Sequence, residues 1–249
     1  MNDFEIFLAL NVKMPISYLG YRLRFISREL RGKRRDQQPT TLPCRSWRNL
    51  VLNAPIRLLE ADKSQGNVSL SEVIMLAKLV TEAKVGEEII EIGTFDGRTT
   101  LNMAVNSHAS CPIFTLDLPQ GDDTAFDVEE GEKSFIDKPK PGMRFVQSDE
   151  PSTQRITQML GDSAIFDWSE HEDKAGFMFV DGSHAYDYAK KDTETAFRLI
   201  RPGGFIVWHD YGVWEGVTKA LEEIEAEQKL GLQHIRGTSL VVYRHPEAA

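Results

Sequence analysis

Two short polar runs in the C-terminal part of the chain combine carboxylates with imidazoles. Asp181 and His184 stand in "VDGSH", and His209 and Asp210 stand in "WHDY". Each run follows an apolar stretch that is typical of a buried strand. If the two strands are neighbours, roughly 5 Å apart, Asp181 and Asp210 can share a divalent cation such as Mg²⁺. Such an ion would orient a substrate hydroxyl and lower its pKa.

The two histidines extend this pattern in different ways. The pKa of a free imidazole is about 6.5, so His184 is predicted to take a hydroxyl proton at neutral pH. His209, as a ligand, departs from an all-oxygen Mg²⁺ site and would favour Mn²⁺ or another metal that tolerates imidazole. Each residue alone also has a structural interpretation: Asp181 as a turn cap, His184 in a satisfied hydrogen bond, and His209 as a core histidine. Their expected convergence favours catalysis by Asp181, His184 and Asp210.

Residues 88–100, "EIIEIGTFDGRTT", predict a strand, a glycine turn and a helix. A dinucleotide fingerprint needs glycine at its first, third and sixth positions, which are here Gly93, Phe95 and Arg98, and no Gly-Lys-Ser/Thr phosphate loop follows. Gly93 is expected to let the backbone approach a ligand, and Gly97 to let the helix begin close to the strand. The free N–H groups at that helix start suit a carboxylate as well as a phosphate.

Further polar residues follow at two predicted strand ends. Asp117 comes 24 residues after Gly93, at the place where an acid binds ribose hydroxyls, and "LGDS" puts Asp162 and Ser163 where they can contact an adenine edge. A ligand with a carboxylate, a ribose and an adenine but no phosphate is S-adenosylmethionine. The residues expected to bind it are Glu91, Gly93, Thr94, Phe95, Gly97, Thr99, Asp117, Asp162, Ser163 and Asp181.

Strand and helix patterns alternate from Ser69 onward, which predicts a doubly wound parallel sheet covered on both faces. Ser69 and Glu72 form a capping-box signature for the first helix, and residues 232–244 predict an antiparallel hairpin. The acidic excursion 119–154 is either functional or mobile, and "RFVQ" within it is a rival for the third strand. The predicted strands are Glu88–Gly93, Ile113–Leu118, Ile156–Gly161, Phe177–Asp181 and Phe205–Asp210, and the predicted helices cover about 69–84, 97–108, 185–200 and 215–229.

Residues 85–245 resemble a class I S-adenosylmethionine-dependent methyltransferase. "EIGTFDGRTT" is similar to the first motif of the catechol and caffeoyl-CoA O-methyltransferases, and "FVDGSHAYDYAKKDTETAFRLIRPGGFIVWHDYG" resembles the bacterial group that includes macrolide-sugar O-methyltransferases. The resemblance implies a Rossmann-like, seven-stranded α/β sheet whose last hairpin is antiparallel. In the catechol-type relatives, metal ligands occupy the positions matching Asp181 and Asp210, and a catalytic lysine occupies the position matching His184.

The charge distribution divides the chain. The net charge is −9 and the pI is about 5.2, which argues against nucleic acid as the main partner. Residues 1–60 carry 11 basic and 5 acidic residues, so they are predicted to form a basic, mostly helical extension, with a methyltransferase domain over 61–249. Within the extension, 18–35 predict an amphipathic helix and 36–43 a linker. The helix is expected to pack on the domain or on another subunit, which makes a homo-oligomer the expectation; peripheral membrane contact is the alternative.

Cys44 and Cys111 are the only cysteines, so no disulfide framework or metal motif is predicted. No apolar run is long enough to span a membrane and the N-terminus lacks a basic leader, so the prediction is a cytoplasmic protein. The leading functional hypothesis is a metal-assisted O-methyltransferase acting on a hydroxyl of a small molecule or glycosyl group. The alternative is a non-catalytic accessory subunit that binds S-adenosylmethionine; a nucleotide-sugar or NAD enzyme is disfavoured by Phe95 and Arg98.

Overall fold

The computed structural model describes residues 40–47, 55–61, 68–136 and 140–247. The helix predicted over 18–35 and residues 36–39 of the predicted linker lie outside these ranges. The strands are β1 (Cys44–Arg45), β2 (Glu88–Ile92), β3 (Ile113–Asp117), β4 (Ile156–Leu160), β5 (Ala175–Val180), β6 (Ile200–Trp208), β7 (Gln233–Ile235) and β8 (Val241–Arg244). The main helices are α3 (Leu70–Leu79), α4 (Arg98–Asn106), α7 (Tyr186–Leu199) and α8 (Glu215–Gln228).

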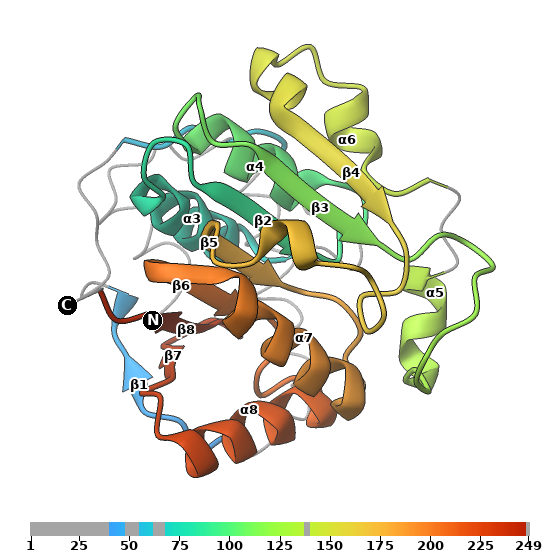
Figure 1. Ribbon diagram of the computed structural model, residues 1–249, viewed down its shortest axis with the longest axis vertical. Coiled ribbons are helices and arrows are strands. Elements are labelled where there is room, and N and C mark those ends of the chain that lie inside the picture. The colour runs from blue at the N-terminus through green and yellow to red at the C-terminus, as the bar shows by residue number, and fades with distance from the viewer. Residues whose placement is uncertain (1–39, 48–54, 62–67, 137–139, 248–249) are drawn as a thin grey trace, which may run out of the picture.

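The described strands form one sheet in the order β1-β7-β8-β6-β5-β2-β3-β4 (Figure 1). Strands β2 to β6 run parallel, and β8 pairs antiparallel with both β6 and β7. The strand order reverses at β2, which pairs with β3 on one side and β5 on the other. The doubly wound sheet and its antiparallel hairpin are therefore confirmed, and the reversal at β2 is where such sheets bind ligands.

The sheet has eight strands over the described residues, one more than the seven expected. The extra strand, β1, pairs parallel with β7 through Cys44 and His234. A two-residue strand has no readable periodicity, so the sequence does not predict it, and it directly follows the predicted linker 36–43. Leu42, just before it, is buried, and its N–H donates to the Tyr211 hydroxyl at 3.0 Å. This part of the basic extension is thus built into the sheet, and a division at residue 60 stays a prediction.

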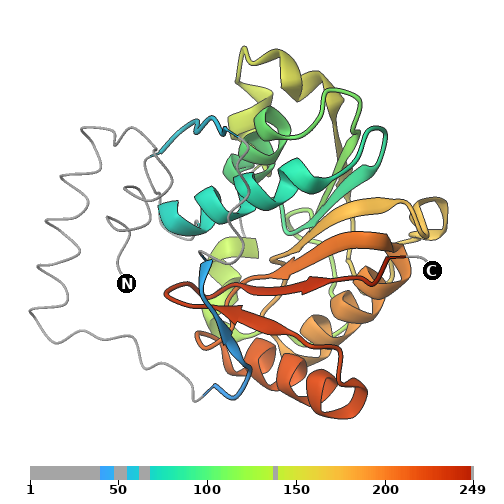
Figure 2. The same ribbon diagram turned by 90° about the vertical axis from the view of Figure 1, so that its left-hand side faces the viewer.

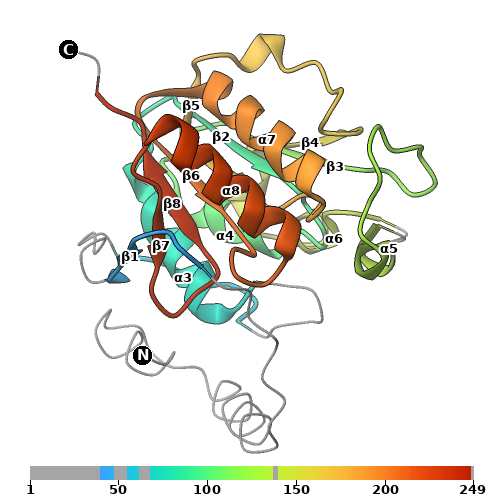
Figure 3. The ribbon, with the colours of Figure 1, turned by 90° about the horizontal axis from the view of Figure 1, so that it is seen from below.

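Helices cover both faces of the sheet, as Figures 2 and 3 show. Successive residues of each central strand enter opposite cores: Ile89 and Phe177 pack with α3 and α4, and Ile90 and Met178 pack with α7 and α8. Burial on both faces explains why these strands are almost continuously apolar. None of the described helices is both long and apolar enough to cross a bilayer.

Local sequence signals determine several element ends. The capping box of α3 is present, because the Ser69 N–H donates to Glu72 Oε2 at 2.7 Å and the Glu72 N–H donates to Ser69 Oγ. The "RFVQ" alternative for the third strand is wrong: its residues lie in and after a short helix, α6 (Met143–Val146), which begins after Gly142 at a φ of +75°. The remaining short helices are η2 (Val80–Glu82), η3 (Glu130–Glu132), α5 (Lys133–Ile136), η4 (Pro151–Arg155) and η5 (Ser169–His171).

Residues 55–61 run along α4 and are held by polar side chains of that helix. Asn102 donates to and accepts from the backbone of Leu59, and Asn106 does the same at Arg57, at 2.8–3.1 Å. Arg98 is fully buried, and its guanidinium donates to the carbonyls of Glu60, Ala61 and Val68. The domain core therefore depends on chain that precedes α3.

Candidate active site

The predicted site residues lie at the carboxyl ends of β2 to β6, which meet along one edge of the sheet (Figure 1). Glu91 is in β2, Asp117 ends β3, and Asp162 follows β4 by two residues. Asp181 directly follows β5, and His209 and Asp210 directly follow β6. The parallel topology thus brings together residues that are far apart in the sequence.

The glycine turn after β2 is fixed by its own polar groups. The Phe95 N–H donates to Asp117 Oδ2 at 2.6 Å, which ties the turn to the end of β3. The Thr94 and Thr115 hydroxyls are 2.6 Å apart and buried. Phe95 itself has a φ of +48°, an uncommon conformation for a non-glycine residue. One carboxylate oxygen of Asp117 is therefore used to hold the turn.

The two glycines serve backbone packing. A Cβ at Gly93 would lie 1.9 Å from the main-chain oxygen of Asp181, so this glycine lets β2 approach the end of β5. A Cβ at Gly97 would lie 2.6 Å from the Phe145 ring, so this glycine lets α4 begin against α6. Both φ angles are positive, which also favours glycine. The sequence predicts that Gly93 allows the backbone to approach a ligand, and the structure shows it against the Asp181 backbone. It predicts that Gly97 allows the helix to begin close to the strand, and the structure shows it against Phe145.

Glu91 is completely buried, and its Oε2 accepts hydrogen bonds from the Thr100 and Thr115 hydroxyls. Burial raises the pKa of this carboxyl to about 8, although the two hydroxyls oppose the shift. Its second oxygen, Oε1, has no hydrogen-bond partner. A carboxyl that is held protonated at neutral pH is suited to organising the turn rather than to acting as an anion.

The predicted adenine contacts are only partly available. Asp162 accepts from the main-chain N–H groups of Ala125 and Ala164 and from the Tyr188 hydroxyl, at 2.6–2.9 Å. Its carboxylate is therefore occupied by the protein in this arrangement, while Ser163 is half-buried beside it. Thr99 is buried at the second position of α4.

His209 lies between three carboxylates. Its Nδ1 is 2.9 Å from Asp181 Oδ1 and 3.3 Å from Asp210 Oδ2, and its Nε2 is 3.4 Å from Glu72 Oε2. Burial alone would lower the pKa of this imidazole, but Asp181, Asp210 and Glu72 outweigh burial and raise the pKa well above 6.5. Both ring nitrogens of His209 thus face carboxylates.

His184 is engaged in the same way. Its Nε2 is 2.7 Å from Asp210 Oδ2, its Nδ1 is 2.5 Å from Glu132 Oε1, and its ring stacks on Trp214 with centroids 4.5 Å apart. Burial opposes the charged form, but hydrogen bonds to Asp210 and Glu132 raise the pKa to about 9. The ordinary pKa assumed from the sequence therefore does not apply, and His184 can act as a base only when it loses one of these partners.

A divalent cation is compatible with part of this site. One ligand atom each from Asp181, His184 and Asp210 lies within 4.8 Å of the others. Since the imidazoles are already paired with carboxylates, the carboxylates are the groups with acceptor capacity left. The donor set thus fits an oxygen-binding ion at Asp181 and Asp210, and it does not favour His209 as a third ligand.

Sequence reasoning missed Glu132 and the second role of Glu72. Glu132 lies in the acidic excursion, where nothing distinguishes it from its exposed acidic neighbours. Glu72 was explained completely by its capping box, yet it also pairs with His209 and accepts from Ser239 at 2.8 Å. Trp208 and Tyr211, which flank His209 and Asp210, are packing residues: the Trp208 indole N–H donates to Thr193, and the Tyr211 hydroxyl accepts from the Leu42 N–H.

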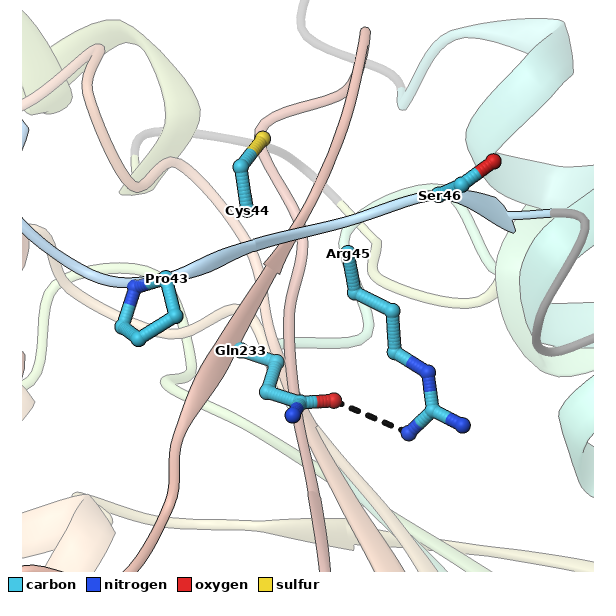
Figure 4. Close-up of a pocket in the computed structure, with 5 residues that line it drawn as sticks. All are labelled: Pro43, Cys44, Arg45, Ser46 and Gln233. Atoms are coloured by element: carbon cyan, nitrogen blue, oxygen red, sulfur yellow. Dashed lines mark hydrogen bonds between the residues drawn. The ribbon is translucent and has the colours of Figure 1, made fainter.

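A separate pocket of about 380 Å³ lies between β1 and β7, as Figure 4 shows. It is lined by Pro43, Cys44, Arg45, Ser46 and Gln233, and the Arg45 guanidinium donates to Gln233 at 2.9 Å. None of these five residues belongs to the candidate site. The pocket therefore carries no part of the proposed chemistry.

The fold, and the order of strand-end acids around a glycine turn, resemble those of class I S-adenosylmethionine-dependent methyltransferases. Residues 90–211 match the family model described as a methyltransferase domain, and they include the turn, Asp117, His184 and Asp210. Residues 90–211, just under half of the chain, are therefore similar to that family, and this match supports the enzyme class expected from the sequence.

Solved structures with the same fold are distant in sequence. The O-methyltransferase NovP is 14% identical with a TM-score of 0.56, over 72% of this chain and 81% of that chain. The calicheamicin methyltransferase CalS11 is 17% identical with a TM-score of 0.54, over 70% and 77%. TomG from Streptomyces achromogenes, an O-methyltransferase solved with S-adenosylmethionine, is 16% identical with a TM-score of 0.52, over 73% and 82%. No curated protein sequence matches the chain.

Proposed function

We propose that this methyltransferase transfers the methyl group of S-adenosylmethionine to a hydroxyl oxygen of a small molecule or glycosyl group, with a divalent cation held by Asp181 and Asp210. The observation that carries the proposal is the convergence of Asp181, His184 and Asp210 beside the glycine turn. The names of NovP and TomG, both O-methyltransferases, support oxygen as the acceptor atom. TomG acts in tomaymycin synthesis, which supports a small-molecule acceptor.

The donor would lie along the strand ends from β2 to β5. Asp117, at the end of β3, binds the ribose, and Ser163, after β4, contacts the adenine. N–H groups at the start of α4 receive the donor carboxylate. Four carboxylates, those of Glu72, Glu132, Asp181 and Asp210, surround the two imidazoles, and negative charge on this cluster would favour the positive sulfonium.

The chemistry is a substitution at the sulfonium methyl group. The acceptor oxygen attacks the methyl carbon in line with the departing sulfur, so S-adenosylhomocysteine leaves neutral at sulfur, and the hydroxyl proton goes to His184. A divalent cation bound by the two aspartates would polarise the acceptor hydroxyl and lower its pKa. His184 accepts the proton at Nε2, which requires that this nitrogen no longer donates a hydrogen to Asp210.

A second candidate is an accessory subunit that binds S-adenosylmethionine without turnover. The engagement of both His184 nitrogens favours it, because this arrangement leaves no free base. The two candidates predict the same donor binding and differ in turnover.

The test combines binding with turnover on the full chain. S-adenosylhomocysteine binding is measured by calorimetry, and S-adenosylhomocysteine production is measured with S-adenosylmethionine, Mg²⁺ or Mn²⁺, and a panel of catechols, phenols and glycosides. Binding with turnover of a hydroxyl compound is expected. Binding without turnover across the panel would favour the accessory subunit, and binding of NAD instead of S-adenosylhomocysteine would contradict both candidates.

A further inference from the structure

Glu132 is an acid of the long polar excursion that points into the protein. Only 2% of it is exposed, whereas Glu129 and Glu130 beside it are exposed. Its turn, η3, packs closely on the site: a Cβ at Gly131 would lie 2.8 Å from Trp214 Cη2. The excursion therefore reaches the ring that stacks on His184.

Both oxygens of the Glu132 carboxylate contact donor groups of the protein. Oε1 accepts from the main-chain N–H of His184 and lies 2.5 Å from its ring Nδ1. Oε2 accepts from the Ser183 hydroxyl at 2.9 Å and from the Glu129 N–H at 3.0 Å. A carboxylate with this many fixed donors is an anchor, because displacing it would leave several buried donors without partners.

This anchor determines which nitrogen of His184 faces the site. Glu132 contacts both the main chain and the Nδ1 side of the residue, and Trp214 fixes the ring plane. The opposite nitrogen, Nε2, is thereby directed at Asp210 Oδ2, 2.7 Å away. An acid on Nδ1 that orients an imidazole toward a reacting oxygen at Nε2 is the arrangement of the hydrolase triads.

We propose that Glu132 is the positioning residue of His184, and that Nε2 of His184 is the atom that receives the acceptor proton. In the reactive form the imidazole is neutral and keeps its hydrogen on Nδ1, facing Glu132, so the lone pair is on Nε2. The Nε2 hydrogen is first released to solvent, the hydroxyl proton then goes to the lone pair left on Nε2, and no further reactant is needed. The inference rests on the proposed function and assigns a role to the acidic excursion.

Nitrogen-15 NMR of histidine-labelled full chain with bound S-adenosylhomocysteine tests this assignment. His184→Gln identifies the ring signals of His184. In the wild type, Nδ1 is expected to carry a hydrogen that exchanges slowly with water. Glu132→Gln keeps an amide oxygen that can accept but removes the carboxylate charge, so the Nδ1 hydrogen should exchange about tenfold faster, as expected when a charge-assisted contact weakens by about 1.5 kcal/mol. Glu130→Gln, an exposed neighbour, should leave it unchanged.

A wild-type His184 without a hydrogen on Nδ1 would overturn the inference, and this measurement needs no variant to fold. An unchanged signal in folded Glu132→Gln would overturn it as well. Failure of the wild type to bind S-adenosylhomocysteine in calorimetry would instead contradict the proposed function. The two failures are therefore distinguishable.

Discussion

The Nδ1 of His209 lies 2.9 Å from Oδ1 of Asp181, and the same ring faces Glu72 from its other nitrogen. This imidazole therefore lies among the carboxylates that would bind a metal. Glu72 contacts the ring from α3, which is distant from His209 in the sequence. Despite burial, the interaction with His209 keeps the pKa of Glu72 well below its usual range. Asp181 and Glu72 thus contact the same imidazole from its two nitrogens.

Replacing His209 with Gln should lower the free energy of unfolding by about 3–5 kcal/mol, because buried carboxylates then lose their counter-ion. Urea denaturation at pH 7 measures the change. His171→Gln is the matched control: His171 is also buried but pairs with one carboxylate, Glu88, at 2.8 Å, so this variant should lose less stability.

Mn²⁺ should stabilise His209→Gln more than the wild type. If the variant instead loses stabilisation by Mn²⁺, His209 is a metal ligand.

Asp117→Asn should weaken S-adenosylhomocysteine binding by roughly 10- to 150-fold, the value of a hydrogen bond to a charged group of about 1.5–3 kcal/mol. The asparagine oxygen can still accept from the Phe95 N–H, so the glycine turn should persist. Calorimetry measures the affinity, and Asp122→Asn, an exposed acid on the following loop, should bind like the wild type. Equal affinities for all three proteins would remove Asp117 from the donor site.

Glu91 should make the stability of the cofactor-free protein depend on pH. Its pKa is about 8 in the folded protein and 4.5 as its ordinary value, so between these values the folded state holds a proton that the unfolded state has lost. The free energy of unfolding should therefore fall as pH rises through this window, with a slope of up to about 1.4 kcal/mol per unit. Glu91→Gln cannot titrate and should lack this component. Urea denaturation at pH 5, 6.5 and 8 compares the two proteins, and parallel pH profiles would contradict the assignment.

Gly93→Ala should be far more damaging than Gly86→Ala. Both glycines have a positive φ, so both variants incur the strain of about 1–2 kcal/mol for a left-handed residue. Only at Gly93 would the new Cβ meet backbone, 1.9 Å from the Asp181 oxygen, whereas Gly86 has open space. Thermal unfolding should show a modest shift for Gly86→Ala and a severely destabilised Gly93→Ala. Similar shifts would mean that the end of β5 can move away.

Two truncations test how far the folded domain extends. A chain that begins at residue 40 keeps β1 and the partners of Arg98, so its thermal unfolding should resemble that of the full chain. A chain that begins at residue 69 loses the carbonyls of Glu60, Ala61 and Val68 and leaves a buried guanidinium unpaired, at a cost of about 3–5 kcal/mol. Equal melting temperatures for the two truncations would show that Arg98 finds other partners.

Local periodicity explains why most of the fold could be predicted. The runs around Ile89 and Phe177 are apolar on both faces, and strand ends of a parallel sheet meet at one edge, so Asp181 and Asp210 could be placed together from the sequence. Glu132 could not be found in this way, because its contact with His184 spans 52 residues and its segment has no period. The charge states of His184 and His209 depend on these distant carboxylates, and so they also required the structure.

The pairing of β1 with β7 bears on how the chain folds during synthesis. Cys44 meets His234, which is translated 190 residues later. At about 5–20 residues per second, the segment around Cys44 leaves the ribosome roughly 10–40 s before its partner exists. Helices and the parallel β2–β3 pair can form in that interval, but the sheet edge at β7 can be closed only after the C-terminal hairpin is made. β1, the first described strand in the sequence, can therefore join the sheet only after β7 has been synthesised.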